Sequence, residues 1–361
     1  MTEDEKYMRR CIQLAKNGMK NSQPNPMVGA VIVCNGRIIG EGYHQRCGEG
    51  HAEVNAIASV KETELLSQST IYVSLEPCSH YGKTPPCADL IISKGIPKVV
   101  VGCLDPFAKV NGLGIKKLRD AGIAVTVGVL EAECLALNKR FMTFHSLHRP
   151  FVTLKWAQSA DGFIAAEGQR TQISNSLAQS ICHKRRAEHQ AIIVGRVTAE
   201  TDNPHLDVRK WVGNNPIRVV IDRERKLPST LHLFDGSIPT IVFTQGESDI
   251  NHEKSKNHTV VMTDGLQQTN ITYESIDFSS DIIPQILKRL HSRGVQSLLV
   301  EGGTRLLQSF IDSEMWDEAF VETGTEVLYQ GVEAPRIHHA QVVEVTPIDN
   351  HTMTFLTKTK S

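Results

Sequence analysis

The sequence predicts a two-domain α/β protein, and three observations lead to this expectation. The chain has 361 residues, a length that two domains of ordinary size would fill. Hydrophobic residues make up 40% of the chain and charged residues 22%, which is the usual composition of globular proteins. Short apolar runs typical of strands alternate with amphipathic stretches typical of helices, and this alternation predicts layers of helices packed on sheets.

The first half begins with an amphipathic stretch at 5–18 that ends at a glycine, which predicts a helix. Asn35-Gly36 predicts a two-residue hairpin turn between a buried strand at 28–33 and a second strand at 37–40. Further strands are expected at 70–75, 98–102 and 124–127, and helices after 51, after 87, at 114–121 and at 131–145. Gly112-Leu113-Gly114 lacks the third glycine of a dinucleotide fingerprint, so we interpret it as a loop.

Arg149-Pro150 breaks the last of these helices, and we therefore expect one domain at 1–147 and a second at 148–361. Strands in the second domain are expected at 151–156, 191–195, 218–222, 240–244 and 297–301, and helices at 175–186, 281–294 and 305–313. Two short runs near the end, 319–322 and 352–357, are expected to close the sheet as a hairpin.

The charge balance argues against two classes of partner. The formal net charge is −1, which provides no bulk attraction to nucleic acid or to an anionic membrane, so recognition of a phosphate must be local. The eight cysteines show no disulfide-like framework, and neither a signal peptide nor a long apolar run is recognisable. We therefore expect a reduced, cytoplasmic protein, and the sequence is compatible with a homo-oligomer.

The strongest motif is His51-Ala52-Glu53, followed by Pro77-Cys78 and Pro86-Cys87. One imidazole and two thiolates can hold Zn²⁺ and leave its fourth position open for water, which zinc makes acidic near neutral pH. Glu53 is not needed as a ligand and can carry a proton instead. This is the pattern of the zinc deaminases, H-x-E followed by P-C-x-x-C, except that eight residues separate the two cysteines here.

A closed, purely structural zinc site with His80 as a fourth ligand is the alternative interpretation. Three features favour the catalytic one: a single pair of cysteines, a glutamate beside the histidine, and a cysteine at an expected helix start. The partial positive charge of a helix start lowers the pKa of a thiol, which favours the thiolate that a metal needs.

Several segments together resemble the RibD family, the bifunctional deaminase/reductases of riboflavin biosynthesis. The segments are 23–29, Gly42-Tyr43-His44, 51–53, Leu75 to His80 and Thr84 to Cys87, and the eight-residue spacing is what the family carries. The resemblance implies a cytidine-deaminase-like three-layer α/β/α domain. It also implies that Asn25 binds the pyrimidine and that His80 and Lys83 lie near the substrate's 5′-phosphate. His44 could equally be structural.

In the second half, a buried strand runs through Gly302-Gly303 into a helix, an arrangement that can bind a phosphate. This segment, together with 154–162 and 201–209, resembles the family's reductase domain. The resemblance implies a dihydrofolate-reductase-like fold that binds NADPH without the usual glycine fingerprint. NADPH would contact Ala157, Gln172, Thr198, Asp202, Gly303, Thr304, Arg305, Leu306, Leu307, Gln308 and Ser309. The ribosylaminopyrimidine would contact Lys155, Arg170, Leu206, Arg209 and Glu301. The chain departs from the family at Arg170 and Gln172, where many relatives have serine and tryptophan.

The reactions implied by the resemblance are a hydrolytic deamination and a reduction. The first converts 2,5-diamino-6-(5-phosphoribosylamino)pyrimidin-4(3H)-one at a zinc site, and the second uses NADPH to form 5-amino-6-(5-phospho-ribitylamino)uracil. Two alternatives come from other classes. A nucleic-acid deaminase would share the motif but needs a basic face and aromatic residues, and only 6% of the chain is aromatic. A non-enzymatic protein would use zinc structurally and its second half as a ligand-binding module.

Overall fold

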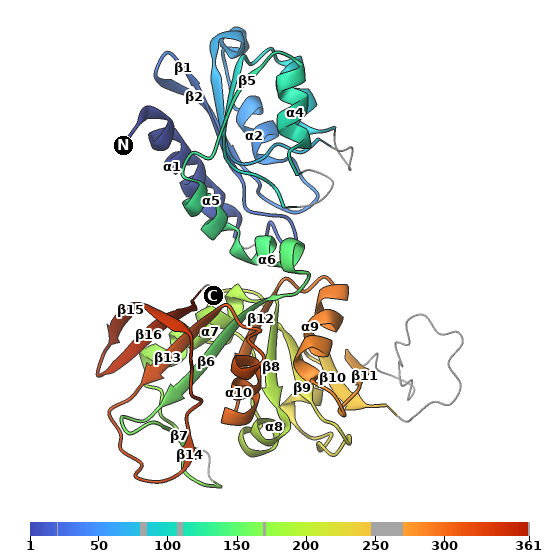
Figure 1. Cartoon of the computed structure of the whole chain (residues 1–361), viewed down its shortest axis with the longest axis vertical. Helices are drawn as coiled ribbons and strands as arrows, with labels where there is room; N and C mark the ends of the chain where they lie inside the picture. Colours follow the sequence, from blue (N-terminus) through green and yellow to red (C-terminus); the bar gives the residue numbers. More distant parts are fainter. Residues whose placement is uncertain (20, 80–84, 107–110, 169–170, 247–269, 360–361) are drawn as a thin grey trace. The chain divides into compact units, whose positions relative to one another are not determined.

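The computed structural model describes residues 1–19, 21–79, 85–106, 111–168, 171–246 and 270–359. The chain divides into two compact units, Met1–His148 and Arg149–Ser361 (Figure 1). His80, Lys83 and Arg170, all named above as substrate contacts, lie outside the described residues.

The first unit is built on a five-stranded sheet with the order β2-β1-β3-β4-β5. Its strands are β1 (Gly29–Cys34), β2 (Arg37–Tyr43), β3 (Thr70–Leu75), β4 (Lys98–Cys103) and β5 (Ala124–Val127). β1 pairs antiparallel with β2 and β3, whereas β3, β4 and β5 run parallel. Cys34 pairs with Arg37 across Asn35-Gly36, both of which have positive φ, so the predicted two-residue hairpin is confirmed.

Helices cover both faces of this sheet (Figure 1). They are α1 (Glu3–Ala15), α2 (Ala52–Ala58), α3 (Cys87–Ser93), α4 (Leu113–Asp120), α5 (Glu131–Leu137) and α6 (Lys139–Leu147), with short 3₁₀ turns η1 (Lys16–Gly18) and η2 (Thr63–Gln68). Apolar side chains of α2, α3 and α4 share one core with the sheet, and those of α1 and α5 share a second core on its other face. The unit is therefore a three-layer α/β/α sandwich, as expected.

The second unit contains a nine-stranded sheet with the order β11-β10-β9-β8-β12-β6-β13-β16-β15. Its strands are β6 (Phe151–Gln158), β8 (Ala191–Gly195), β9 (Ile217–Ile221), β10 (Thr240–Gln245), β11 (Ile271–Ile276), β12 (Ser297–Glu301), β13 (Glu318–Thr323), β15 (Ala340–Ile348) and β16 (His351–Lys358). The strands from β11 to β13 are parallel, and β16 and β15 continue the sheet antiparallel. β7 (Phe163–Ala165) and β14 (Val332–Glu333) form a separate pair.

The helices of this unit also pack on both faces of the sheet. They are α7 (Ser176–Glu188), α8 (Arg196–Asp202), α9 (Ile282–Ser292) and α10 (Thr304–Asp312), with a 3₁₀ turn η3 (His232–Phe234). The largest core lies between the sheet and helices α9 and α10. α8 and α7 contribute to two smaller cores that contain other sheet residues. The predicted α/β class is therefore observed in both units.

Three expectations about elements were wrong in detail. The helix expected at 131–145 is interrupted at Asn138, whose side chain instead bonds both backbone groups of Met27 at 2.8 Å. The runs at 319–322 and 352–357 do pair antiparallel, but the hairpin is formed by β15 and β16. The expected loop at Gly112-Leu113-Gly114 is the start of α4.

Candidate functional sites

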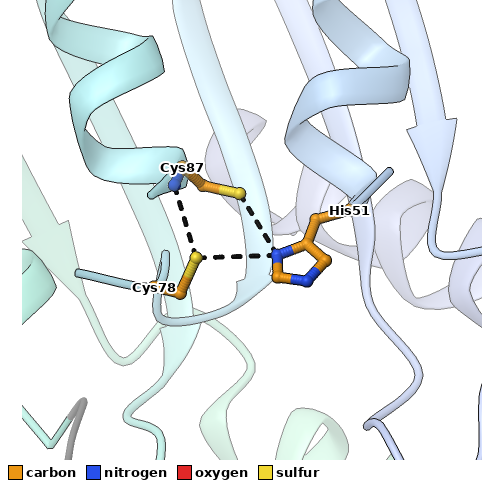
Figure 2. A group of neighbouring side chains, drawn as sticks. All are labelled: His51, Cys78 and Cys87. Atoms are coloured by element: carbon orange, nitrogen blue, oxygen red, sulfur yellow. Dashed lines mark hydrogen bonds between the residues drawn. The ribbon is translucent and has the colours of Figure 1, made fainter. Parts of the chain in front are cut away.

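The first site brings His51, Cys78 and Cys87 together from three separate segments (Figure 2). His51 is the N-cap of α2, Cys87 is the first residue of α3, and Cys78 follows the end of β3. The Nδ1 atom of His51 lies 3.3 Å from Sγ of Cys87 and 3.6 Å from Sγ of Cys78. The backbone N–H of Cys87 donates to the Cys78 sulfur at 3.3 Å. All three side chains therefore point at one small volume.

This arrangement fits a zinc ion. Typical zinc–sulfur and zinc–nitrogen bond lengths place such atoms about 3.5 Å apart around a tetrahedral ion, and the two nitrogen–sulfur distances here bracket that value. Two thiolates and one imidazole are also the soft-to-borderline donors that zinc prefers. His51, Cys78 and Cys87 supply three ligands, which leaves a fourth position for water.

The two sulfurs also have opposite titration behaviour. The hydrogen bond from the Cys87 thiol, assisted by His51, lowers the pKa of Cys78 to about 4 against the effect of burial. The same contact with the Cys78 thiolate raises the pKa of Cys87. Two neighbouring thiolates repel each other, and a divalent cation held between them would favour the deprotonation of both.

Glu53 is buried beside this cluster, with only 3% of its surface exposed. It occupies the first turn of α2, two residues after His51. Burial raises the pKa of its carboxyl to about 7, while the neighbouring His51 charge acts in the opposite direction. A carboxyl group in this environment can exchange a proton near neutral pH, which is what a general acid/base requires.

Asn25 reaches the same site through His44. The Nδ2 atom of Asn25 lies 3.1 Å from Nε2 of His44, and Nδ1 of His44 lies 3.2 Å from the carbonyl oxygen of Gly50. The rings of His44 and His51 meet edge to face with their centroids 5.3 Å apart. The sequence left the role of His44 open, and the structure shows that it links Asn25 to the metal-binding histidine.

The second site is a cavity of about 680 Å³ in the second unit. Nine of the residues named above as cofactor or substrate contacts line it: Lys155, Ala157, Gln172, Thr198, Asp202, Leu206, Arg209, Glu301 and Gly303. They come from β6, the loop between β7 and α7, α8, the loop after α8, the end of β12 and the start of α10, which are distant in sequence.

The stretch Thr304–Ser309 does not line this cavity. It forms the first two turns of α10, and the side chains of Leu306 and Leu307 are buried in the main core. Gln308 accepts a hydrogen bond from the backbone N–H of Arg336 at 2.9 Å. Leu306 and Leu307 thus belong to the main core of the second unit, and the NADPH contacts assigned to Thr304–Ser309 remain a prediction.

Charged groups gather on one side of the cavity. Arg186 donates from Nε and Nη2 to the two oxygens of Glu301 at 3.1 and 2.7 Å, and the Sγ atom of Cys182 lies 3.3 Å from the same carboxylate. Burial lowers the pKa of Lys155, but the electrostatic effect of Cys182 and Glu301 outweighs it and the net pKa is raised. Arg186 could not be recognised from the sequence pattern because it lies in the basic run 184–186, which resembles a solvated helix face. The only sequence signal for its role is that Arg186 follows Cys182 by four residues, which places both on the same face of α7.

His205, His232 and Asp235 form a second group whose ligand atoms lie close enough to hold a metal. Asp235, however, accepts a hydrogen bond at 2.8 Å from Arg218, a fully buried cation. The two imidazole rings stack with their centroids 3.6 Å apart. A buried arginine that already neutralises the carboxylate disfavours a second cation, so this group is a poorer metal site than the first.

None of the helices in the described part of the chain combines the length and apolar character that a membrane span requires.

The family comparisons agree with both sites. A family model described as the cytidine and deoxycytidylate deaminase zinc-binding region matches residues 1–103, and one described as the RibD C-terminal domain matches residues 150–324. The riboflavin biosynthesis protein RibD of Aquifex aeolicus is 38% identical over 333 residues, which cover 91% of this chain and 89% of the relative. The RibD protein of Bacillus amyloliquefaciens is 40% identical over 318 residues, covering 87% and 82%.

Solved structures give the same result over almost the full length. A crystal structure from Thermotoga maritima, described as a diaminohydroxyphosphoribosylaminopyrimidine deaminase/5-amino-6-(5-phosphoribosylamino)uracil reductase, is 36% identical with a TM-score of 0.84 and 99% coverage of both chains. Acinetobacter baumannii RibD is 30% identical with a TM-score of 0.85 and the same coverage. Two matched domains, one zinc-binding and one reductase, and relatives of this identity along most of the chain place it in the RibD family, the bifunctional zinc-dependent deaminases and NADPH-dependent reductases of riboflavin biosynthesis.

Proposed function

We propose that the first unit deaminates a phosphorylated diaminopyrimidine and that the second unit then reduces its ribosyl side chain. The substrate is 2,5-diamino-6-(5-phosphoribosylamino)pyrimidin-4(3H)-one, and the final product is 5-amino-6-(5-phospho-ribitylamino)uracil. The observation that carries the proposal is the placement of buried Glu53 beside three converging zinc ligands. The relative from Thermotoga maritima, described as a deaminase and reductase of the same two kinds, supports it.

In the deamination, His51, Cys78 and Cys87 hold zinc, which makes water acidic enough to act as a nucleophile near neutral pH. Glu53 accepts the proton that the water loses and delivers it to the amino nitrogen, which leaves as ammonia. Asn25 binds the pyrimidine, and its hydrogen bond with His44 fixes the orientation of the amide. His80 and Lys83 remain proposed contacts of the 5′-phosphate.

In the reduction, NADPH supplies hydride when it is bound. We assign Ala157, Gln172, Thr198, Asp202 and Gly303 to the cofactor because they line one cavity together. The main task of this unit is to hold the cofactor and the sugar carbon in contact, because a well-oriented pair reacts without the entropic cost of finding each other.

The substrate side of the same cavity is cationic. Arg209 can bind the phosphate in bidentate fashion, and Leu206 supplies an apolar wall. Lys155 is placed near the reacting sugar, where Glu301 keeps it protonated. Arg170 stays a proposed contact from the sequence alone.

We propose a cytoplasmic location, because none of the eight cysteines forms a disulfide in the structure and disulfides are rare in that compartment. We further propose that the chain works as a homo-oligomer with a small-molecule substrate and without nucleic acid.

Product identification tests the proposed reaction order. Purified protein is incubated with the diaminopyrimidine phosphate, first without and then with NADPH, and each product is identified by mass spectrometry. Ammonia should be released without the cofactor, and NADPH should be consumed only afterwards. Reduction that precedes ammonia release would contradict the order, and no turnover of either kind by zinc-loaded protein would contradict the function.

A further inference from the structure

Glu76 connects the metal-binding cysteine to the start of a helix. It stands between the end of β3 and Pro77-Cys78, and only 4% of its surface is exposed. Its carboxylate accepts backbone N–H groups from Gly112 and Gly114 at 2.9 Å each. The N–H groups of Ile115 and Asp105 complete the set at 3.2 and 3.4 Å. A buried carboxylate that accepts four backbone donors is held firmly in place.

The two glycines make this approach possible. Gly112 has a φ of +79°, which L side chains rarely adopt, and a Cβ atom on Gly114 would lie 2.0 Å from the carbonyl oxygen of Pro77. The N-terminus of α4 thus lies directly against the Glu76-Pro77 backbone. The first N–H groups of a helix have no partner within the helix, and its N-terminal end carries a positive potential that can attract an anion. In α4 the carboxylate of Glu76 takes the place of such an anion. This explains a glycine pair that fits no dinucleotide fingerprint.

The same helix also contacts the segment that carries the second cysteine. Lys117 of α4 forms an ion pair with Asp89 of α3 at 2.5 Å, and Cys87 is the first residue of α3. The backbone N–H of Ala88 donates to the carbonyl oxygen of Cys78 at 3.1 Å. α4 therefore supports the segments that carry Cys78 and Cys87 from one side.

We propose that Glu76 is a positioning residue of the zinc site, which fixes the Cys78 thiolate by anchoring Glu76-Pro77 to the N-terminus of α4. The proposal rests on the assignment of His51, Cys78 and Cys87 as zinc ligands. Glu76 touches neither the metal nor the substrate and acts only through the backbone that leads to Cys78.

A Glu76→Gln variant separates this role from simple packing. Glutamine has the same shape, but its amide nitrogen is a donor and would face backbone N–H groups that need an acceptor. Loss of a residue that orients a metal ligand typically weakens metal binding by about 10–100-fold. We expect a loss of this size for Glu76→Gln. Glu41→Gln is the matched control, because the Glu41 carboxylate also accepts two hydrogen bonds, both from Arg10 of α1, a helix that carries no metal ligand.

Zinc affinity is measured on the full-length protein by competition with a chromophoric chelator. Cobalt-substituted samples report the sulfur ligands independently, since a displaced Cys78 weakens the thiolate-to-cobalt charge-transfer band. The reductase rate on supplied intermediate checks that the second unit is folded.

Wild-type zinc affinity and a wild-type cobalt spectrum in Glu76→Gln would overturn the proposal. If that variant does not fold, Gly114→Ala decides the question, because its Cβ atom would lie 2.0 Å from the carbonyl oxygen of Pro77 and 3.2 Å from the Glu76 carboxylate, and would push the start of α4 away from the Glu76-Pro77 backbone while keeping the glutamate itself. Normal zinc binding by Gly114→Ala would then contradict the role of this contact. Failure of the wild-type protein to bind one zinc per chain would instead overturn the assignment of the metal ligands themselves.

Discussion

Arg186 and Glu301 form a two-point ion pair in the wall of the reductase cavity, with nitrogen–oxygen distances of 3.1 and 2.7 Å. Both side chains are only 12% exposed, so water screens the pair weakly. Glu301 ends β12 and Arg186 lies near the end of α7, and the contact joins the sheet to the helix. The charge state of Glu301 therefore affects both the stability of the second unit and the arrangement of cations around the cavity.

We expect the second unit to lose stability when Glu301 is protonated. Burial alone would raise its pKa, but Arg186 and Lys155 lower it to about 2, below the ordinary value of 4.5. A lowered pKa stabilises the fold fully above pH 4.5, and the contribution disappears as the pH falls from 4.5 to about 2. Its size is on the order of 3 kcal/mol. All three tryptophans lie in the second unit, so urea unfolding followed by their fluorescence measures its stability at each pH.

In the same assay, Glu301→Gln should be destabilised at pH 7, because Arg186 is left buried without its partner. The variant should then lose little further stability between pH 4.5 and 3. Glu333→Gln removes an exposed ion pair with Arg336 and serves as the control. If the stability of Glu301→Gln depended on pH in the same way as that of the wild type, the acid sensitivity would belong to other groups.

Glu53→Gln should abolish ammonia release while zinc remains bound. The amide keeps the shape of the side chain but cannot transfer the proton, and loss of general acid/base catalysis costs about 10²- to 10⁴-fold. Zinc content is measured by atomic absorption, and the reductase step is assayed on supplied 5-amino-6-(5-phosphoribosylamino)uracil. Glu49→Gln, an exposed neighbour outside α2, is the control. Loss of zinc from Glu53→Gln would mean that Glu53 has been given the wrong role.

Removal of zinc should separate the two activities. Chelation at neutral pH should eliminate deaminase turnover, because His51, Cys78 and Cys87 cannot create an acidic water by themselves. The reductase rate should persist, since the cavity that we assign to it is lined entirely by residues of the second unit. Activity is measured again after zinc is added back. A reductase rate that falls in parallel with zinc loss would show that the metal is needed for both reactions.

Arg209→Ala should raise the reductase KM by about tenfold with a smaller effect on kcat, because one charge-assisted contact with the phosphate is worth about 1.5–3 kcal/mol and neighbouring cations replace part of it. The Arg209 guanidinium is half exposed and paired with Asp207, so the loss should not unfold the protein. The KM of Arg209→Lys should lie between the values for the wild type and for Arg209→Ala, since lysine keeps the charge but not the bidentate geometry.

The matched control is Arg196→Ala. Arg196 lies in α8, is also partly exposed and also pairs with an acidic side chain, that of Glu200. For a substrate that lacks the phosphate, Arg209→Ala and Arg196→Ala should have the same reductase KM. If Arg209→Ala changes KM for the two substrates by the same factor, the phosphate contact belongs to another residue.

Asn138→Ala should destabilise the first unit by about 1–3 kcal/mol, because both backbone groups of Met27 lose their partner. Hydrogen exchange of the Met27 amide, which should become faster, measures the effect locally. Asn270→Ala removes an exposed amide contact with Gly236 in the second unit and is the control. If the Met27 amide exchanged in Asn138→Ala at the wild-type rate, the hydrogen bonds of the Asn138 side chain would not be what protects it.

Local sequence patterns located most of the fold. β3, β5, β8 and β12 have the boundaries expected from apolar runs, because a short buried strand carries its burial in the sequence itself. β15 was missed since it lies at the sheet edge, with most of its residues exposed, and an edge strand does not need an apolar pattern. The break at Asn138 was missed because the partner of its side chain, the Met27 backbone, lies 111 residues away, and no local pattern reports a contact of that kind.

The motifs and the family resemblance were enough to predict the chemistry, because the spacing of His51, Glu53, Cys78 and Cys87 indicates a zinc site with a neighbouring acid/base group and the resemblance implies the two reactions. Which side chains come together in a site could be seen only in the folded chain. The fold joined Arg186 to Glu301 and Glu76 to the start of α4, and it packed Leu306 and Leu307 into the main core of the second unit. The physical reason is that a side chain's role depends on which neighbours remove it from water, and those neighbours come from distant parts of the chain.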